Sequence, residues 1–237
     1  MIDWRLEQYP ELGSTSDEVM LRAKAGEAAG LAVLALRQTA ARGSRGRAWT
    51  SPEGNLSLSV LMRPACPVAE AGLFSLLAGV AVAEALEHLG GRDLTLKWPN
   101  DILCQQAKLA GILIDAVPEN GRLDWLVIGI GVNLLTAPVV PGRVTTSLMA
   151  QGVEVAPVIA ARAILSRLAL WCEASAADIR RAWLARGHAE GTQLDIAYAG
   201  RRLTGRFAGL SDHGALLLQR ENGIDVLSTG DVLLAGR

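Results

Sequence analysis

Short apolar runs separated by turn residues fill most of the first 135 positions. The run Leu31–Leu36, bounded by Gly30 and a polar loop, is typical of a buried strand. Val68–Leu89 has helix-forming composition and ends at Gly90-Gly91, which predicts the main core helix. The pattern therefore favours many strands and few long helices. Further strands are expected at Trp4–Tyr9, Asn55–Met62, Leu94–Trp98, Ile102–Cys104, Leu109–Val117 and Trp125–Leu134.

Cap and turn residues indicate how these elements connect. Gly13–Asp17 supplies hydroxyl and carboxylate caps for a helix that continues to about Ala25. Tight turns at Gln105–Ala107 and Glu119–Gly121 join consecutive strands into hairpins. Strands joined in this way form a mainly antiparallel or mixed sheet, which disfavours the strand-helix alternation of a dinucleotide-binding fold.

The character of the chain changes after two more predicted helices, Pro157–Cys172 and Ala176–Arg186, in which Trp171 and Trp183 are expected to pack. From Gly191 onward, short strand-like runs alternate with glycine-containing turns. We therefore expect an α+β fold with a mixed, mainly antiparallel sheet flanked by helices over residues 1–186. A small β-barrel is expected over residues 187–237.

Composition narrows the function classes. Half of the residues are apolar and 20% are charged, as in globular proteins, and the formal net charge is −1. With this net charge the protein surface as a whole is not positively charged, so broad nucleic-acid binding is disfavoured. Any cluster of arginines is then expected to bind a small anion locally.

Cysteine usage and the apolar runs point to the cytoplasm. Cys66, Cys104 and Cys172 are odd in number and widely spaced, which fits buried free thiols better than disulfides or a metal site. No signal peptide is recognisable at the start of the sequence. The longest apolar stretch, Leu73–Leu86, is too short to span a bilayer and predicts a buried helix rather than a membrane segment.

An arginine-rich loop is the first candidate site. Arg42, Arg45 and Arg47 alternate with Gly43, Ser44 and Gly46, so guanidinium groups and backbone amides can converge on phosphate or carboxylate oxygens. A solvated basic loop is the alternative interpretation. Trp49 follows directly and is either a core residue or a stacking face for a planar base.

A second candidate site lies between Leu94 and Ala116. Lys108 stands between a polar turn and an apolar strand, where a buried ammonium is costly without an anionic partner, and this favours a ligand-facing role. Gly111 lets a ligand approach the strand backbone. Lys97 and Asp101 are interpreted either as ligand-facing groups or as a structural ion pair.

Two weaker signals remain. The run VIGIGVN places Gly129 and Asn133 on a strand and its end, which by itself is compatible with tight packing or with a nucleotide. The histidines are expected to be surface or capping residues without metal-ligand spacing. They are His88, His188 and His213.

Five motifs in order give the chain a specific resemblance. They are STS at Ser14–Ser16, QTAARGSRGRAW at Gln38–Trp49, KWPND at Lys97–Asp101, KLAGIL at Lys108–Leu113 and GIGVN at Gly129–Asn133. Together with a C-terminal segment like the family's SH3-like domain, they resemble biotin protein ligase over nearly the whole chain. The resemblance implies a class II aminoacyl-tRNA synthetase-like core with a small C-terminal SH3-like β-barrel.

The resemblance also implies a two-step reaction. The biotin carboxylate attacks the α-phosphorus of ATP, with Mg²⁺ on the phosphates, to give biotinyl-5'-AMP and pyrophosphate. A lysine of a biotin carboxyl carrier domain of a biotin-dependent carboxylase then attacks the mixed anhydride. Bifunctional members carry an N-terminal DNA-binding domain, for which there is no room before the STS motif, so DNA binding and repression are not expected.

Residue roles carry over motif by motif. The catalytic residues implied are Lys108, Arg42 and Asp101, with Asp101 orienting the acceptor lysine or taking its proton. The residues implied for biotin are Ser14, Thr15, Ser16, Gln38, Arg42, Gly43, Ser44, Lys108 and Gly111. Those implied for ATP or the adenylate are Arg45, Arg47, Trp49, Lys97, Asn100, Gly129 and Asn133.

The chain departs from the family pattern in its arginine loop. Ala41 replaces a glycine and narrows the backbone freedom of the loop, and Ser44 replaces an arginine. The lost cation predicts weaker retention of the adenylate, unless Arg45 or Arg47 compensates.

Two other functions stay open. A lipoate or octanoate protein ligase shares the architecture and the adenylate chemistry, although KWPND and KLAGIL favour biotin. A non-catalytic biotin sensor would keep the pocket without needing Lys108. We also expect a sheet edge at Asn55–Met62 to support homodimer formation or carrier pairing, because exposed strand backbone accepts another strand.

Overall fold

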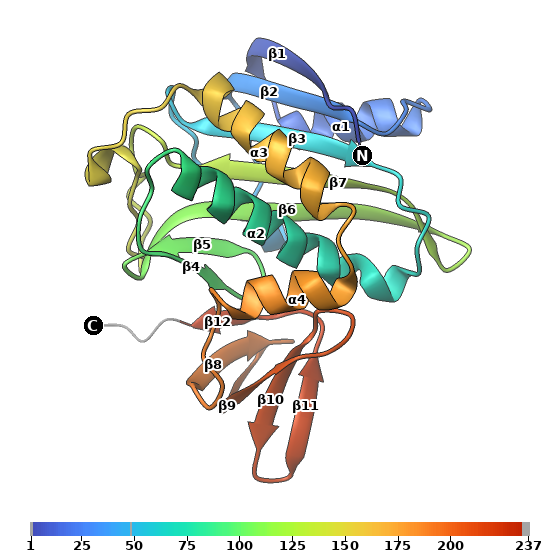
Figure 1. Ribbon diagram of the computed structural model, residues 1–237, viewed down its shortest axis with the longest axis vertical. Helices are drawn as coiled ribbons and strands as arrows, with labels where there is room; N and C mark the ends of the chain where they lie inside the picture. Colours follow the sequence, from blue (N-terminus) through green and yellow to red (C-terminus); the bar gives the residue numbers. More distant parts are fainter. Residues whose placement is uncertain (1, 48, 234–237) are drawn as a thin grey trace.

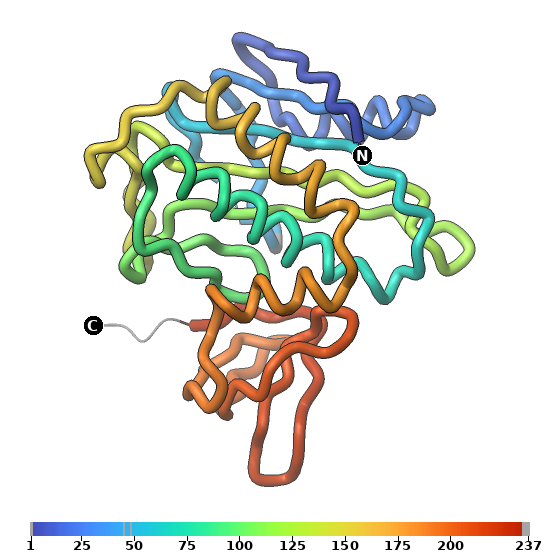
Figure 2. The backbone as a smooth tube through the Cα atoms, in the orientation of Figure 1, coloured from blue at the N-terminus to red at the C-terminus, as the bar shows by residue number. Residues whose placement is uncertain are grey.

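A large mixed sheet and a small antiparallel sheet organise the computed structural model, which describes residues 2–47 and 49–233 (Figures 1 and 2). The large sheet has seven strands in the order β1-β2-β3-β7-β6-β5-β4, and the small sheet has five in the order β11-β10-β9-β8-β12. The α+β expectation is confirmed. The strands of the large sheet are β1 (Arg5–Leu12), β2 (Leu31–Gln38), β3 (Leu56–Met62), β4 (Leu94–Lys97), β5 (Asp101–Cys104), β6 (Ala107–Glu119) and β7 (Arg122–Val132).

The pairing within the large sheet follows the connections. β1 and β2 are parallel because helix α1 (Thr15–Lys24) crosses between them, and all the other neighbours are antiparallel. Hairpin turns at Gln105-Gln106 and Asn120-Gly121 have positive φ at both central residues, which suits the twist of the strands they join. The predicted hairpins are therefore confirmed.

The expectation of a strand edge at Asn55–Met62 is wrong. β3 pairs with β2 on one side and with β7 on the other, and all seven of its residues are buried. The edges of the large sheet are β1 and β4. β7 lies beside β3 although 59 residues lie between the two strands in sequence, and no local pattern reveals such an insertion.

Alternation along the strands divides the core between the two faces of the large sheet. Leu56, Leu58 and Val60 of β3 pack toward the helices α2 (Ala71–His88) and α3 (Pro157–Trp171), while Leu61 packs under α1 on the opposite face. Figure 1 shows α2 and α3 in front of the sheet and α1 behind it. The face that carries α1 is the one that holds the site described below.

Helix α2 is the core helix that the sequence predicts. With the 3-10 turn η2 (Val68–Glu70) it is long and apolar enough to cross a membrane, but it is covered by the sheet, α3 and α4 (Ala176–Leu184). Twelve of its eighteen residues are buried, which identifies it as a core helix. Two further 3-10 turns, η1 (Ser44–Gly46) and η3 (Met149–Gln151), lie in loops.

The small sheet has five strands, the last of which, β12, is only three residues long. Its strands are β8 (Gln193–Tyr198), β9 (Arg201–Leu210), β10 (Leu216–Arg220), β11 (Gly223–Leu227) and β12 (Asp231–Leu233). It docks on the large sheet through Trp98, which is 1% exposed and whose indole Nε1 donates to the carbonyl of Gly214 at 3.2 Å. The Trp98-Pro99 peptide bond is cis.

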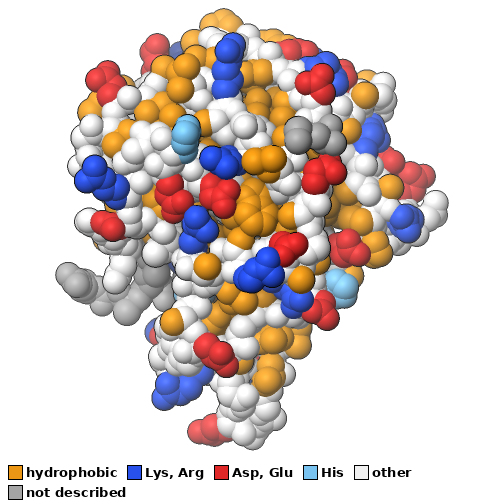
Figure 3. Space-filling model, viewed as in Figure 1, with side chains coloured by type: hydrophobic (Ala, Val, Ile, Leu, Met, Phe, Trp, Pro, Cys, Tyr) orange, Lys and Arg blue, Asp and Glu red, His pale blue; other side chains and the backbone are white. Residues whose placement is uncertain are grey.

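Surface charge and thiols agree with the sequence analysis. On the face in Figure 3, acidic and basic side chains are interspersed. All three cysteines carry free thiols; Cys104 is buried, and Cys66 and Cys172 are half-buried. His88 and His213 are exposed, as expected.

His188 is not the surface residue that the sequence suggested. Its ring lies between Trp183 of α4 and Phe207 of β9, with ring centroids 6.0 and 5.5 Å away, and its Nε2 accepts from the backbone N–H of Trp98 at 3.4 Å. Burial, with a smaller contribution from the charge of Lys97, lowers the pKa of His188 to about 4. The imidazole is therefore neutral in the folded protein at neutral pH.

This burial predicts acid sensitivity. A histidine in the unfolded chain binds a proton near pH 6.5, whereas His188 in the folded protein stays neutral until about pH 4. The unfolded state therefore binds more protons than the folded state between these two pH values. The stabilisation is complete above pH 6.5 and is lost as the pH falls toward 4. Between pH 7 and 4.5, urea unfolding should show wild type losing about 2–3 kcal/mol more than His188→Gln. An equal loss in both proteins would refute this role, and exposed His88→Gln serves as control.

Candidate functional site

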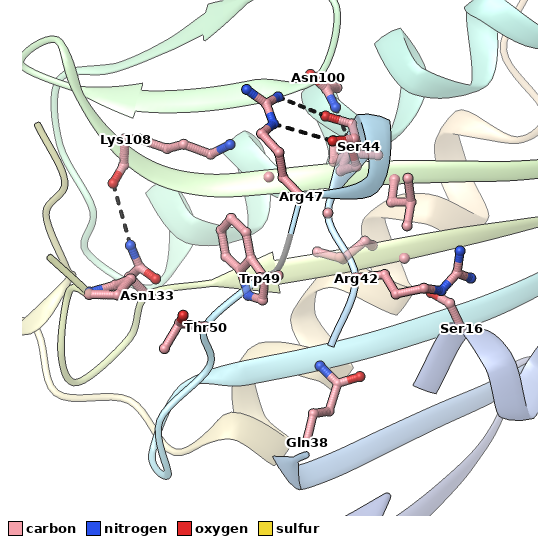
Figure 4. Close-up of a pocket in the computed structure, with 18 of the residues that line it drawn as sticks. Ser16, Gln38, Arg42, Ser44, Arg47, Trp49, Thr50, Asn100, Lys108 and Asn133 are labelled. Atoms are coloured by element: carbon pink, nitrogen blue, oxygen red, sulfur yellow. Dashed lines mark hydrogen bonds between the residues drawn. The ribbon is translucent and has the colours of Figure 1, made fainter. Parts of the chain in front are cut away.

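Small residues on three adjacent strands open a cavity on the α1 face of the large sheet. Ser59 of β3 pairs with Gly129 of β7, and Gly131 of β7 pairs with Gly111 of β6. These positions point to the same face, so the sheet there has a floor almost without side chains. The cavity above it has a volume of about 360 Å³. In Figure 4, Ser16 and Gln38 lie on one side of Trp49, and Lys108 and Asn133 lie on the other.

One end of the cavity is lined by hydroxyl and amide groups. Ser14 caps α1 by accepting from the N–H of Asp17, as the sequence predicts, and this places Thr15 and Ser16 in the first turn. Gln38 ends β2 beside them, and its Oε1 accepts from the backbone N–H of Thr15 at 2.7 Å. This end of the cavity is lined by Ser14, Thr15, Ser16 and Gln38.

Trp49 lies on the glycine floor. A Cβ at Gly131 would be 2.6 Å from the indole and one at Gly111 would be 3.1 Å from it, so both positions need glycine to seat this ring. The Lys108 ammonium lies 5.2 Å from the ring centroid, a cation-π distance. Trp49 is therefore part of the cavity wall and does not belong to the hydrophobic core.

Lys108 and Lys97 share the carboxylate of Asp101. Lys97 Nζ is 2.9 Å from Asp101 Oδ2, Lys108 pairs with Oδ1, and the side chains of Lys97 and Asp101 are both 5% exposed. Burial would raise the pKa of Asp101, but the charges of Lys108 and Lys97 outweigh it and hold the pKa below its usual value. Burial lowers the pKa of Lys108, which Asp101 opposes only in part.

The two lysines differ in their position relative to the cavity. Lys108 lines the cavity, whereas Lys97 and Asp101 are not among its lining residues and form the structural ion pair that the sequence left open. A role for Lys97 at the nucleotide is therefore not supported by its position. Asp101, buried and held by two ammonium groups, is also poorly suited to take a proton from an incoming amine.

Asp231 of β12 connects the small sheet to this cluster. Its carboxylate is 3.1 Å from Lys97 Nζ, 3.2 Å from Arg47 and 3.0 Å from Arg143, and its side chain is 11% exposed. Arg47 and Arg143 line the cavity from two different loops. A carboxylate from the C-terminal sheet thus helps to fix both loops at the cavity mouth.

The arginine loop is tied down at several points. Arg42 pairs with Asp17 of α1 at 2.9 Å and with Asp115 of β6 at 3.0 Å, which spans the cavity at its hydroxyl end. Arg47 donates to the hydroxyl of Ser44 at 3.1 Å, and Gly43 and Ser44 line the cavity. The backbone of Arg45 belongs to η1, but its side chain is outside the described part of the chain.

Two asparagines stabilise the other end. Asn133 is 1% exposed, and its Nδ2 donates to the carbonyls of Lys108 and Thr146, while its Oδ1 has no hydrogen-bond partner. Asn100 donates to the carbonyl of Ile112 at 2.6 Å and so fixes the turn after Pro99 against β6. The two amide side chains therefore hold the backbone around this end of the cavity in place.

Comparison with known proteins shows which protein family has these features. Residues 14–133 match the model of the biotin/lipoate A/B protein ligase family, and residues 196–234 match the biotin protein ligase C terminal domain. A biotin--[acetyl-CoA-carboxylase] ligase of Paracoccus denitrificans is 34% identical, with 86% of this chain and 90% of that protein aligned. The chain belongs to the biotin protein ligase family.

Other members agree in sequence and structure. A ligase of the same name from Mycobacterium tuberculosis is 34% identical over 97% of this chain and 89% of its own length. The alignment with the bifunctional ligase/repressor of Bacillus subtilis covers 66% of that protein. The structure of the Aquifex aeolicus biotin protein ligase in complex with biotin and ATP is 27% identical, covers 96% of this chain and 97% of that one, and has a TM-score of 0.81.

Within this biotin protein ligase fold, several residues differ from their sequence-based placement. Gly129 lies under Ser16, whose Oγ would be 2.7 Å from a Cβ there, so it belongs to the hydroxyl end rather than to the end assigned to the nucleotide. Ser59, Arg143 and Asp231 take part in or support the site but are not predicted from the sequence. Serines at positions 57 and 59 of an otherwise apolar strand were a usable signal, but nothing local marked Arg143 or Asp231.

The Asp231 contacts predict a large stability effect for this ligase. Asp231→Asn leaves Lys97, Arg47 and Arg143 without their shared counter-charge, and removal of one partner from a buried pair costs about 3 kcal/mol. Urea denaturation at pH 7 measures it. Asp195→Asn is the matched control, since Asp195 lies in the neighbouring β8 and pairs with Arg202 in solvent. Similar midpoints for the two variants would contradict this account.

Proposed function

We propose that this protein is an ATP-dependent biotin--[biotin carboxyl carrier protein] ligase. It activates biotin as biotinyl-5'-AMP and transfers the biotinyl group to a lysine of a carrier domain. The family membership supports this reaction class. The observation that carries it for this chain is a single cavity with a polar end suited to the ureido ring of biotin and a buried lysine at the other end.

The polar end complements a ureido group. Gln38 Oε1 accepts from both the N–H and the hydroxyl of Thr15. The NH₂ group of the Gln38 amide therefore points away from Thr15 and can donate to another group. Ser14 Oγ accepts from Asp17 N and keeps its own proton for donation. A ureido carbonyl needs such donors, and a lipoyl dithiolane has no group that would use them.

The lysine end fits adenylate formation. A carboxylate oxygen of biotin forms a bond to the α-phosphorus of ATP, and the bond to pyrophosphate breaks. Two anions must approach each other, so a cation that contacts both lowers the barrier. Lys108 projects into the cavity from β6 as that cation. Arg47 and the amides near Gly43 and Ser44 would cover the reacting groups, whereas Arg42 is held at the hydroxyl end by Asp17 and Asp115.

The far end fits a nucleotide base. Asn133 lines this end of the cavity and keeps its wall in place, because its Nδ2 donates to the carbonyls of Lys108 and Thr146. Trp49 offers a planar face in the same cavity. These two groups support ATP as the nucleotide.

Magnesium enters this proposal as part of MgATP. The cavity lining in the described part of the chain contains no carboxylate, and a cluster of three or more His, Cys, Asp or Glu residues is absent from those residues. Mg²⁺ prefers phosphate oxygens and water with one or two carboxylates. We therefore assign the ion to the substrate and give it no ligand from this chain.

Transfer completes the reaction. The amine of the carrier lysine loses a proton, forms a bond to the anhydride carbonyl carbon, and AMP leaves. Because Asp101 is held by Lys97 and Lys108, we assign it the positioning of Lys108 rather than proton removal. Residues 1–186 form the catalytic domain and residues 187–237 the C-terminal domain in this proposal, with a cytoplasmic carboxylase as the source of the acceptor.

Incubation with biotin, MgATP and a biotin carboxyl carrier domain tests the function, with mass spectrometry detecting the added biotinyl group. Wild type should modify one lysine, and Lys108→Ala should reduce biotin-dependent ATP/pyrophosphate exchange at least about 100-fold. Lys24→Ala, an exposed lysine on α1, is the control. Transfer of lipoate in place of biotin would support the rival ligase, and biotin binding without transfer would support a sensor.

Asp101→Asn separates the two roles considered for Asp101. If Asp101 positions Lys108, both half-reactions should slow by a similar factor, on the order of tenfold or more. Pyrophosphate exchange measures the first step, and transfer from preformed biotinyl-5'-AMP measures the second. A loss confined to transfer would instead favour Asp101 as the base for the acceptor lysine.

A further inference from the structure

Ser59 is a fully buried polar residue in the middle of β3. Its exposure is 0%, and it stands between Leu58 and Val60, both also fully buried. Its hydroxyl lies 2.8 Å from Thr15 Oγ1 and 3.0 Å from Ser16 Oγ. Ser59 therefore joins the two hydroxyl groups that α1 presents to the cavity.

The backbone N–H of Thr15 decides which hydroxyl donates and which accepts in each of these hydrogen bonds. Thr15 N–H can only donate, so the Gln38 atom that it meets at 2.7 Å is the acceptor Oε1. The Thr15 hydroxyl then donates to the same oxygen at 3.2 Å. Since Thr15 has used its one proton, the contact with Ser59 requires Ser59 to donate to Thr15.

The same argument extends to Ser16. Ser59 has donated its proton to Thr15, so it accepts from Ser16. All protons in the chain Ser16, Ser59, Thr15, Gln38 therefore point the same way. Thr15 Oγ1 keeps one lone pair and Ser16 Oγ keeps two, which makes both hydroxyls acceptors toward the cavity.

We infer that Ser59 is a positioning residue that holds the Thr15 and Ser16 hydroxyls as hydrogen-bond acceptors for the two N–H groups of the ureido ring. This inference rests on the proposed function. Without Ser59, the Ser16 hydroxyl loses the acceptor that it has among the described residues, so its proton is free to turn toward the ligand, where it would meet another donor. The site would then lose its fit to N–H groups without losing its shape.

Gly129 supports this assignment. A Cβ at that position would lie 2.7 Å from Ser16 Oγ and 3.6 Å from Ser59 Oγ, so a larger residue would displace the Ser16 hydroxyl. The pairing of Ser59 with Gly129 across β3 and β7 thus provides both the hydroxyl and the space that the chain of hydrogen bonds needs.

Ser57 provides a matched control. It lies two residues away on the same face of β3 and is 3% exposed, but its hydroxyl donates to Ser51 and is not part of the chain to Thr15. A merely structural role for a buried serine would make the two substitutions alike. A role through Thr15 and Ser16 makes Ser59 distinct.

The test compares Ser59→Ala and Ser57→Ala in biotin-dependent ATP/pyrophosphate exchange. Ser59→Ala should raise the KM for biotin about tenfold, the effect of one hydrogen bond, while kcat stays within about twofold. Ser57→Ala should leave both values unchanged. Desthiobiotin, which keeps the ureido ring but lacks the thioether, should show the same rise in Ser59→Ala.

Coupling to Ser16 gives a second readout. In a Ser16→Ala background the further substitution Ser59→Ala should change the biotin KM little, because the hydroxyl through which the loss of Ser59 reaches the ligand is already absent. Should Ser59→Ala fold poorly, Ser59→Cys, whose thiol is a weaker donor, should raise the KM in the same direction.

Several outcomes would overturn the inference. Four outcomes would contradict it: an unchanged biotin KM in Ser59→Ala, an equal change in Ser57→Ala, a full effect in the Ser16→Ala background, or a rise that disappears with desthiobiotin. The last outcome would indicate direct contact of Ser59 with the thioether. Wild type without biotin-dependent exchange would overturn the proposed function as well, which distinguishes the two failures.

Discussion

A buried ammonium group needs a carboxylate close to it, and this requirement links the parts of the structure. Lys108 projects into the cavity and pairs with Asp101, Asp101 also pairs with Lys97, and Lys97 pairs with Asp231. Each group offsets the desolvation cost of the next. The reactive end of the cavity is therefore one electrostatic unit, although its residues come from β4, β5, β6 and β12.

The floor of the cavity depends on a different constraint, the absence of side chains on this part of the sheet. Gly129 leaves room for the Ser16 hydroxyl, and Gly131 and Gly111 leave room for Trp49. The register of β3, β7 and β6 brings these positions together. Helices pack on the opposite face of the same strands, so this part of the sheet has apolar core on one side and the cavity on the other.

Local signals predicted most of the fold and the motif residues. The Ser14 cap, the Asn120-Gly121 turn and the α2 stop at Gly90 are specified by nearby residues, and each was found where expected. Side chains within a motif, such as Ser14–Ser16, also lie together at the cavity.

Long-range pairing was not accessible from the sequence. The strand at Asn55–Met62 was placed at an edge because its partner β7 comes much later in the chain. Lys97 and His188 likewise meet Asp231 and Phe207, which come later in the chain, only through the tertiary fold, whereas Asp101 meets Lys108 within one hairpin. Local chemistry indicates that a group needs a partner, but it does not say which residue supplies it.

The position of Asp231 also bears on how such proteins can be recombined. The C-terminal sheet looks like an exchangeable module, yet it supplies the counter-charge for Lys97, Arg47 and Arg143 of the larger part. A chimera that joins the first part to the C-terminal domain of a relative must therefore keep an acidic residue at this place in β12. Ion pairs thus cross the sequence boundary between the two domains.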